Sequence, residues 1–236
     1  SDKPWTSDPM LQNYRFCNIY REIDTVSEWI TTNVIKPYEK TNNLWFMLAM
    51  SRLINWPDTL QEIMDKGGWP EKTYNADKVY KILAARADRG EKCVTGAYIV
   101  NSVFPKGANP PDTRKVYYIP YFGLQGLWNM KDVLLQQSGP RGTMGGFVET
   151  MTKSHGWGAF MAYQVAVDLS YSKHHLGKAS DFNTYTSPGP GTTRGMARLM
   201  GGSKKASVRG KALNEYMIRL RALMNARAKE LVKPKW

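Results

Sequence analysis

The chain has 236 residues and a net charge of +13, and 42% of its residues are hydrophobic. That hydrophobic share excludes a disordered chain, because disorder requires low hydrophobicity together with high charge. No apolar run reaches the ~18–20 residues of a membrane span, and neither Cys17 nor Cys93 belongs to a zinc or disulfide motif. The excess of positive charge predicts a polyanionic partner, with nucleic acid ahead of anionic membrane.

Most of the positive charge lies in the last part of the chain. Residues 194–236 hold twelve Lys or Arg and two acidic residues, a net charge of +10. Apolar residues in this stretch recur at helical spacing, which favours a folded basic surface over the alternative, a solubilising tail. Lys204, Lys205 and Arg209 are the candidate DNA contacts in this stretch.

The first half of the chain predicts helices. Asp8 followed by Pro9 is typical of a helix start, and the apolar spacing that follows predicts one amphipathic helix over residues 10–30. Residues 44–54 are apolar nearly all round, which predicts a buried helix that Trp56-Pro57 ends. Two more helices are expected, a short one capped by Asp58 and one that runs from Asn75 or Asp77 to Gly90.

The second half predicts a mixture of helices, loops and two brief strands. Residues 95–100 are β-prone but equally suit the start of a buried helix, and residues 116–120 suit a short strand. The other predicted elements are a loop at 102–111, helices at 128–137, 147–153 and 159–171, a break at 139–142, an irregular loop at 187–191, a helical turn at 196–200, a mobile segment at 201–210 and a last helix at 211–232. We therefore expect a mainly α fold, with one helical catalytic domain over residues 1–200 and a basic linker and amphipathic helix over residues 201–236 packed on it.

A helix-hairpin-helix pattern is centred on Gly156-Trp157-Gly158. Its glycines permit a tight turn and let backbone N–H groups approach a phosphate, so these three residues are candidate DNA contacts, with His155 beside them. Asp181 follows Gly158 by 23 residues. In this spacing the chain resembles helix-hairpin-helix DNA glycosylases, whose catalytic Asp lies about that far downstream, although the Lys usual in their hairpin is missing.

Two polar helix faces are candidate walls of a site. Gln164 and Asp168 are four residues apart and share one face of their predicted helix. Asn18, Arg21 and Asp24 fall at helical spacing along another. Each pattern has a structural alternative, which is a satisfied core network for the first and a buried Arg21–Asp24 ion pair for the second.

The segment from Asp181 to Gly195 combines an acid, hydroxyl groups, glycines and Arg194. Backbone N–H groups, hydroxyls and a guanidinium suit a bound phosphate. The segment lacks the Gly-Lys-Ser/Thr of a Walker A loop, which argues against a kinase or NTPase. The His residues show no metal-ligand spacing, and His174-His175 is expected to lie in a loop, so no metal site is predicted.

Four segments, in order along the chain, together resemble the alpha-glutamyl/putrescinyl thymine pyrophosphorylase family of bacteriophages. Members of this family are also described as amino acid:DNA transferases, and a related helical domain is fused to hydroxymethyluracil DNA kinases. The resemblance spans about residues 14–199, and the basic C-terminal part lies outside it. The segments are 15–24 (RFCNIYREID), 95–100 (TGAYIV), 158–165 (GAFMAYQV) and 189–195 (GPGTTRG).

The resemblance implies a helix-hairpin-helix glycosylase-like fold and a reaction on double-stranded DNA in the cytoplasm of the phage's host. The substrate base is 5-hydroxymethyluracil carrying a pyrophosphate, which a free amino acid or polyamine replaces to give a hypermodified thymine. The base must be flipped out of the duplex. No cofactor is implied, although magnesium can accompany pyrophosphate. The expected catalytic residues are Arg21, Asp24 and Asp181, and the expected substrate contacts are Arg15, Asn18, Tyr98, Gln164 and Arg194.

Two other functions fit the same sequence. One is a glycosylase of this fold, with Asp181 as the acid that assists cleavage of the glycosidic bond. The other is a basic DNA-binding module without catalytic activity, in which the Arg and Asp residues form structural pairs.

Overall fold

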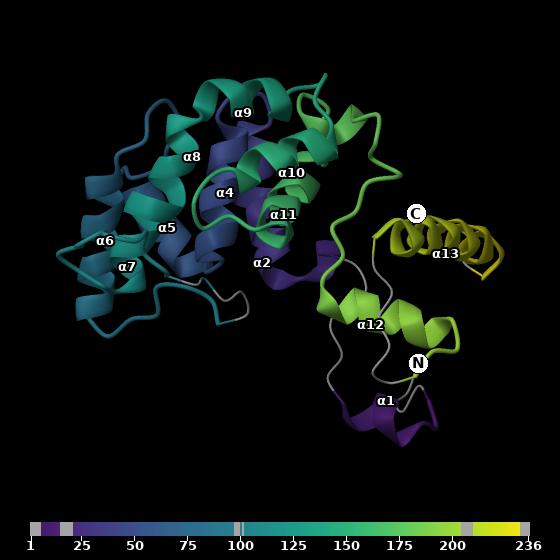
Figure 1. Ribbon diagram of the computed structural model, residues 1–236. Coiled ribbons are helices and arrows are strands. Elements are labelled where there is room, and N and C mark those ends of the chain that lie inside the picture. Colours follow the sequence, from purple (N-terminus) through teal and green to yellow (C-terminus); the bar gives the residue numbers. More distant parts are fainter. Residues whose placement is uncertain (1–5, 15–20, 97–99, 101, 204–209, 232–236) are drawn as a thin grey trace.

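The computed structural model describes residues 6–14, 21–96, 100, 102–203 and 210–231, and within these residues it contains helices and no strand. Most helices form one bundle around α4, whereas α1, α12 and α13 lie to one side of it (Figure 1). The helices are α1 (Pro9–Asn13), η1 (Arg21–Ile23), α2 (Thr25–Ile30), η2 (Thr31–Ile35), α3 (Lys36–Tyr38), α4 (Leu44–Ile54), α5 (Pro57–Asp65), α6 (Ala76–Asp88), α7 (Lys115–Tyr118), η3 (Ile119–Leu124), α8 (Gln125–Asn129), α9 (Lys131–Ser138), α10 (Met144–Thr152), α11 (Ala159–Leu169), η4 (Leu176–Lys178), α12 (Pro190–Leu199) and α13 (Gly210–Leu231). The mainly α prediction is confirmed for these residues.

Helix α4 is the centre of the core. All of its side chains are buried, as its nearly uniform apolar sequence predicts. It ends at Asn55, which adopts the left-handed conformation with φ of 46°. Pro57 then takes the first position of α5, so the break predicted at Trp56-Pro57 is confirmed. Asp58 lies in the first turn of α5 instead of capping it, because the Pro sets the start of the helix one residue earlier.

The single helix predicted over residues 10–30 is wrong. Helix α1 begins after Asp8, as predicted, but ends at Tyr14, which is extended. Asp24 is extended as well, and its side-chain Oδ2 accepts a 2.9 Å hydrogen bond from the backbone N–H of Ser27. An Asp that caps a helix in this way starts a new one, which the apolar spacing alone did not reveal.

The strand predicted over residues 116–120 is also wrong, since α7, η3 and α8 form a continuous helical run there. Val116, Tyr118 and Ile119 are buried, and the run packs against α6, so tertiary packing overrides the local β preference. Of the segment 95–100, residues 95, 96 and 100 lie in neither helix nor strand, and residues 97–99 lie outside the described part. The loop predicted at 102–111 is confirmed.

The helices around the predicted hairpin agree with the sequence. Helix α10 runs from Met144 to Thr152, so it starts three residues before the predicted 147–153 and ends one residue earlier, and α11 ends two residues before the predicted 171. Gly156 has φ of +83°, and a Cβ on it would lie 2.5 Å from the Tyr118 hydroxyl, so this turn requires glycine. Helix α11 packs against both α10 and α4.

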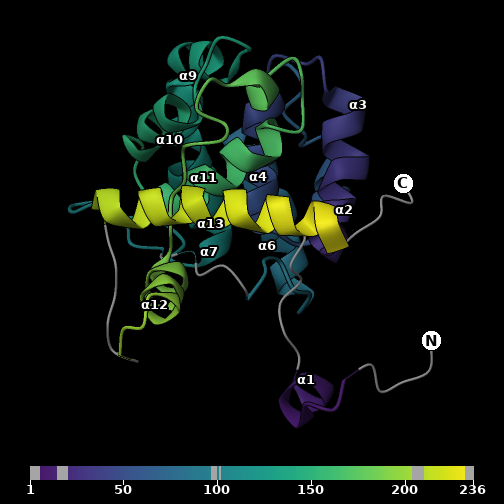
Figure 2. The same cartoon turned by 90° about the vertical axis from the view of Figure 1, so that its right-hand side faces the viewer.

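The C-terminal elements differ from prediction mainly in α12. In place of one turn at 196–200, α12 runs from Pro190 to Leu199, because Pro190 is preorganised for the first helical position. Helix α13 matches the predicted last helix, contacts α12 and passes in front of α11 in the view of Figure 2. Its Leu213 is buried, but Leu223 and Met224 remain 68% and 57% exposed, so the bundle covers only part of its apolar side.

His175 makes the stability of the fold dependent on pH. Its side chain is 5% exposed, and burial lowers its pKa below the ordinary 6.5. Below pH 6.5 the unfolded chain binds a proton that the folded chain does not, so the free energy of unfolding falls as the pH falls, by up to about 1.4 kcal/mol per pH unit. Urea unfolding between pH 7.5 and 5 should show a smaller slope for His175→Gln, whereas the control Asn42→Ala, at an exposed position without a titratable group, should keep the wild-type slope. Equal slopes for all three proteins would contradict this expectation.

Candidate functional site

The charged centre of the protein is a carboxylate held by two arginines. Asp168 on α11 is 1% exposed, and its Oδ2 accepts a 2.6 Å hydrogen bond from Nε of Arg52 on α4. Arg52 also donates to Asp168 Oδ1 at 2.9 Å and to the Ser27 hydroxyl at 3.0 Å. Arg21 in η1 completes the group, with its Nη2 2.8 Å from Asp168 Oδ1. These three side chains carry a formal charge of +1.

Arg21 is the member of this group that reaches solvent, with its side chain 22% exposed. Its Nη1 donates to the Gln164 side-chain carbonyl and its Nη2 to the Gln164 backbone carbonyl at 3.3 Å. Together with the bonds to Asp168 these use four of the five guanidinium N–H groups, and the remaining one, on Nη1, has no partner among the described residues. The structure therefore brings together Arg21 and Gln164, which the sequence predicted as site residues on two separate helix faces.

A second contact holds the η1 turn against the residues that follow α11. The Tyr171 hydroxyl donates to Glu22 Oε1 at 2.7 Å. This hydrogen bond lowers the pKa of Glu22, whereas burial raises the pKa of Tyr171. Arg21 and Glu22 are thus both anchored, and the position of the Arg21 guanidinium is fixed by side chains 143 to 149 residues away.

The sequence predicted that Asp24 and Arg21 share one helix face. This prediction is wrong, because Asp24 is the extended N-cap of α2. The alternative Arg21–Asp24 ion pair is wrong too, since Arg21 pairs with Asp168. The backbone N–H of Asp24 donates to the Arg21 carbonyl at 3.1 Å, so the two residues are nevertheless neighbours. Only Oδ2 of Asp24 has a hydrogen-bond partner among the described residues.

Asp181 holds the start of α10. Its Oδ1 accepts a 2.7 Å hydrogen bond from the backbone N–H of Met144, and its Oδ2 accepts one of 2.8 Å from Gly145. A carboxylate at a helix N-terminus is stabilised by these N–H groups and by the helix dipole. Both oxygens therefore have a structural use that the sequence did not reveal.

Asp181→Asn should lower the free energy of unfolding by about 1–2 kcal/mol, because an amide NH₂ would replace one of the two acceptors at the start of α10. Urea unfolding measures this loss directly. Thr143→Ala, which removes the Thr143 hydroxyl that accepts from Gly146 at 3.0 Å, is the matched control at the same helix end. A variant as stable as the wild type would mean that the Asp181 carboxylate does not hold α10.

The hairpin residues have different environments. Trp157 is 5% exposed, and its indole N–H donates to the Gly123 carbonyl at 2.6 Å, so its side chain belongs to the core and cannot contact DNA in this conformation. Gly156 and Gly158 are exposed, and Gly158 precedes the first turn of α11. His155 is tied to the Val103 carbonyl at 2.8 Å. The hairpin offers backbone, not the Trp157 side chain, to a partner.

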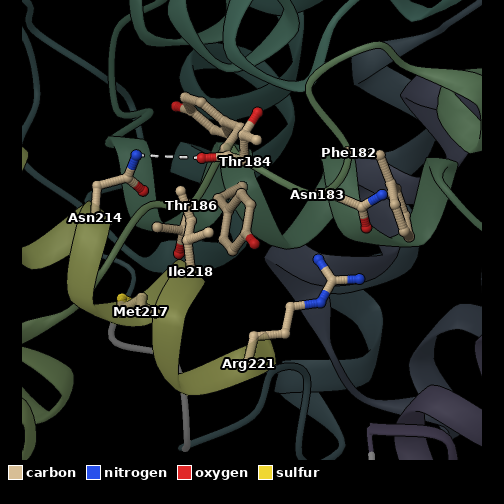
Figure 3. A pocket seen from close by; sticks show the side chains of 10 residues that line it. Phe182, Asn183, Thr184, Thr186, Asn214, Met217, Ile218 and Arg221 are labelled. Atoms are coloured by element: carbon tan, nitrogen blue, oxygen red, sulfur yellow. Dashed lines mark hydrogen bonds between the residues drawn. The ribbon is translucent and has the colours of Figure 1, made fainter. Parts of the chain in front are cut away.

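A cavity of about 190 Å³ lies between α11 and α13 (Figure 3). Tyr163 of α11 lines it, together with residues 182–186 and side chains of α13. Successive residues on a helix are about 100° apart, so Tyr163 faces the cavity while the next residue, Gln164, faces Arg21. The charged group and the cavity thus lie on adjoining faces of α11.

Arg194, predicted in a phosphate-binding loop, is instead an exposed residue of α12, as is Arg198. Arg219, Arg221 and Arg227 are exposed on α13. This side of the molecule is therefore basic, as the charge distribution predicted. The predicted contacts Arg15, Asn18, Tyr98, Lys204, Lys205 and Arg209 lie outside the described residues.

In the part of the chain that the structure describes, no group of three or more His, Cys, Asp or Glu side chains is arranged to hold a metal ion. No helix of that part combines the length and the apolar character needed to cross a membrane.

Comparison with known proteins identifies the family. Residues 1–231 match the family described as 5-hmdU DNA kinase, helical domain. The 5-hmdU DNA kinase of Bacillus phage SP10 is 30% identical over 213 residues, which cover 82% of this chain and 32% of that protein. The chain thus spans about a third of the relative's length. No solved structure matches it.

Proposed function

The chain belongs to the family of the helical domain of 5-hmdU DNA kinases, and we propose that it modifies a pyrimidine in phage DNA by exchanging a pyrophosphate group for an amine. The substrate would be a uracil in DNA whose 5-methylene carbon carries a pyrophosphate. The carbon–oxygen bond to pyrophosphate breaks, a carbon–nitrogen bond to a free amino acid or polyamine forms, and the amine loses a proton. The products are a hypermodified thymine and inorganic pyrophosphate.

The observation that carries this proposal is the group of Arg21, Asp168 and Arg52, which has a net positive charge and reaches solvent through Arg21. A transferase of this kind needs a cation that stabilises the charge developing on the leaving group. Arg21 keeps one N–H at the exposed edge of a group with a net positive charge. Arg194 and Arg198 on α12 are further cations for phosphate, and a magnesium ion bound to the pyrophosphate would add to their positive charge.

Asp24 is better placed than Asp181 to accept the proton that the amine loses. Asp24 is a neighbour of Arg21 and has one carboxylate oxygen without a hydrogen-bond partner among the described residues. Both oxygens of Asp181 accept backbone N–H groups. A general base needs a lone pair within reach of the amine, and we therefore propose that Asp24 accepts the proton and that Asp181 keeps α10 in place.

The similarity to part of a kinase, together with the basic face, also supports a second function, a non-catalytic module that presents DNA to a separate enzyme. One assay separates the functions. The protein is incubated with duplex DNA that contains pyrophosphorylated 5-hydroxymethyluracil and with a pool of amines, and the DNA is digested to nucleosides for mass spectrometry. We expect an amine adduct. An abasic product would indicate a glycosylase, and unchanged nucleosides together with retarded DNA would indicate the non-catalytic module.

A further inference from the structure

We propose that the groove between α2 and α5 binds a short extended segment of a partner protein in which a Lys or Arg adjoins an apolar residue. This goes beyond the proposed function, because the partner is a protein and not the DNA. Helices α2 and α5 are in contact within the bundle (Figure 1). The groove has a volume of about 690 Å³, and its described walls are one side of residues 25–33 and the segment Trp56-Pro57-Asp58.

The long wall of the groove is one face of a helix. Helix α2 continues into η2, and the lining positions 25, 28, 29, 32 and 33 recur along this run at three- and four-residue spacings. The eight steps from Thr25 to Asn33 make the wall roughly 10 Å long. About three residues of an extended chain span that length, so the groove has the dimensions of a short peptide segment.

Two indole rings supply apolar surface to the groove. Trp29 on α2 and Trp56 before α5 are half-buried, so each packs on the core and still lines the groove. Val26 adds an apolar side chain to the same helix face. Tryptophan is among the residues that contribute most to binding energy at protein interfaces, because a partner that covers it desolvates a large apolar surface. These side chains therefore suit an apolar residue of a partner.

Two carboxylates make the groove acidic in a chain whose net charge is +13. Glu28 and Asp58 are exposed, and neither side chain has a hydrogen bond or an ion pair to another described residue. The exposed Asp88, by contrast, is paired with Arg114 at 2.9 Å. No Lys or Arg is among the described residues that line the groove. Two unpaired carboxylates repel the phosphates of DNA and attract a basic partner, so the groove and the partner have complementary charges.

The ring of Trp56 already attracts a cation from the chain itself. The ammonium group of Lys92 lies 3.7 Å from the centroid of this ring, and the indole attracts cations more strongly than other aromatic side chains do. Trp29 and Glu28 offer a ring and a carboxylate that are both on the groove wall. A partner residue such as Lys or Arg can therefore place its stem on a ring and its charge near a carboxylate.

The test screens a positional-scanning library of fluorescent peptides against the whole protein and measures binding by fluorescence polarisation. We expect the bound peptides to carry Lys or Arg next to Leu, Phe or Trp. The best of them should bind about tenfold more weakly to the double variant Glu28→Gln with Asp58→Asn, because two partly exposed charge pairs are lost. Asp132→Asn removes an exposed charge on α9 and should bind that peptide as the wild type does.

Thr32→Arg blocks the groove from within. Thr32 is exposed and lies four residues after Glu28, so the introduced guanidinium pairs with that carboxylate in place of a partner. Arg also favours a helix, and the circular dichroism spectrum should stay that of the wild type. Peptide binding should be abolished.

Three results would overturn the proposal. The first is a library from which no peptide is selected, and the second is a peptide that binds the double variant and Thr32→Arg as it binds the wild type. The third is tetramethylammonium binding as tightly as the best peptide, which would make the groove a site for a small cation. The assay contains no DNA and no free amine, so its outcome does not depend on the proposed transfer.

Discussion

Asp168→Asn should lower the free energy of unfolding by about 3–5 kcal/mol, because it removes the carboxylate charge that pairs with the buried guanidinium of Arg52. Arg52 is 1% exposed, and its two hydrogen bonds to the carboxylate would be lost or weakened. Urea unfolding followed by circular dichroism measures the change.

A double variant distinguishes charge from shape at this position. Arg52→Met with Asp168→Leu removes both fully buried charges and should recover part of the loss, because a buried ion pair can be replaced by apolar side chains at little cost. Asp132→Asn, at an exposed position on α9, is the control and should be as stable as the wild type. If Asp168→Asn were as stable as the wild type, the group of Arg21, Arg52 and Asp168 would not be a structural centre of the fold.

Arg21→Ala should slow amine transfer by about 100-fold, the effect of removing a group that stabilises developing negative charge. The expected loss of stability is small, about 1 kcal/mol, because Asp168 keeps its bonds to Arg52 and the Arg21 side chain is 22% exposed. Single-turnover rates with the pyrophosphorylated duplex, compared with unfolding curves of the same variant, separate the two effects.

Arg89→Ala is the matched control for Arg21. Arg89 also forms ion pairs, with Glu62 and Glu91, and its side chain is 43% exposed, but neither its partners nor Arg89 itself borders α11 or the cavity. Its loss should leave the transfer rate unchanged. A loss of rate in Arg21→Ala that only matched a loss of folded protein would remove Arg21 from the proposed mechanism.

The helices that the sequence predicted correctly are those with a strong local signal. The apolar run of α4, the Asn75 cap of α6 and the glycine turn before α11 each determine their structure within a few residues. The prediction of a strand at 116–120 was wrong because the β-prone side chains there are buried against α6, and a local sequence pattern does not reveal such a contact. The prediction of one long N-terminal helix was wrong because Asp24 accepts a capping hydrogen bond from Ser27 and so starts a separate helix within the apolar pattern.

The candidate site was predictable only in part, because its bonds join distant segments. The sequence indicated Arg21, Gln164 and Asp168 as polar residues on helix faces, but not that they meet. It missed Arg52, although a single Arg within the otherwise apolar run of α4 was a signal for a buried charge that needs a partner.

The central claim is the exchange of pyrophosphate for an amine on a DNA base. The most direct measurement supplies duplex DNA carrying pyrophosphorylated 5-hydroxymethyluracil with an isotopically labelled amine and quantifies both released pyrophosphate and labelled nucleoside. We predict that the two products appear in equal amounts and at the same rate, and that both fall together in Arg21→Ala. Pyrophosphate released without labelled nucleoside, or neither product from a protein that binds the duplex, would contradict the proposed transfer.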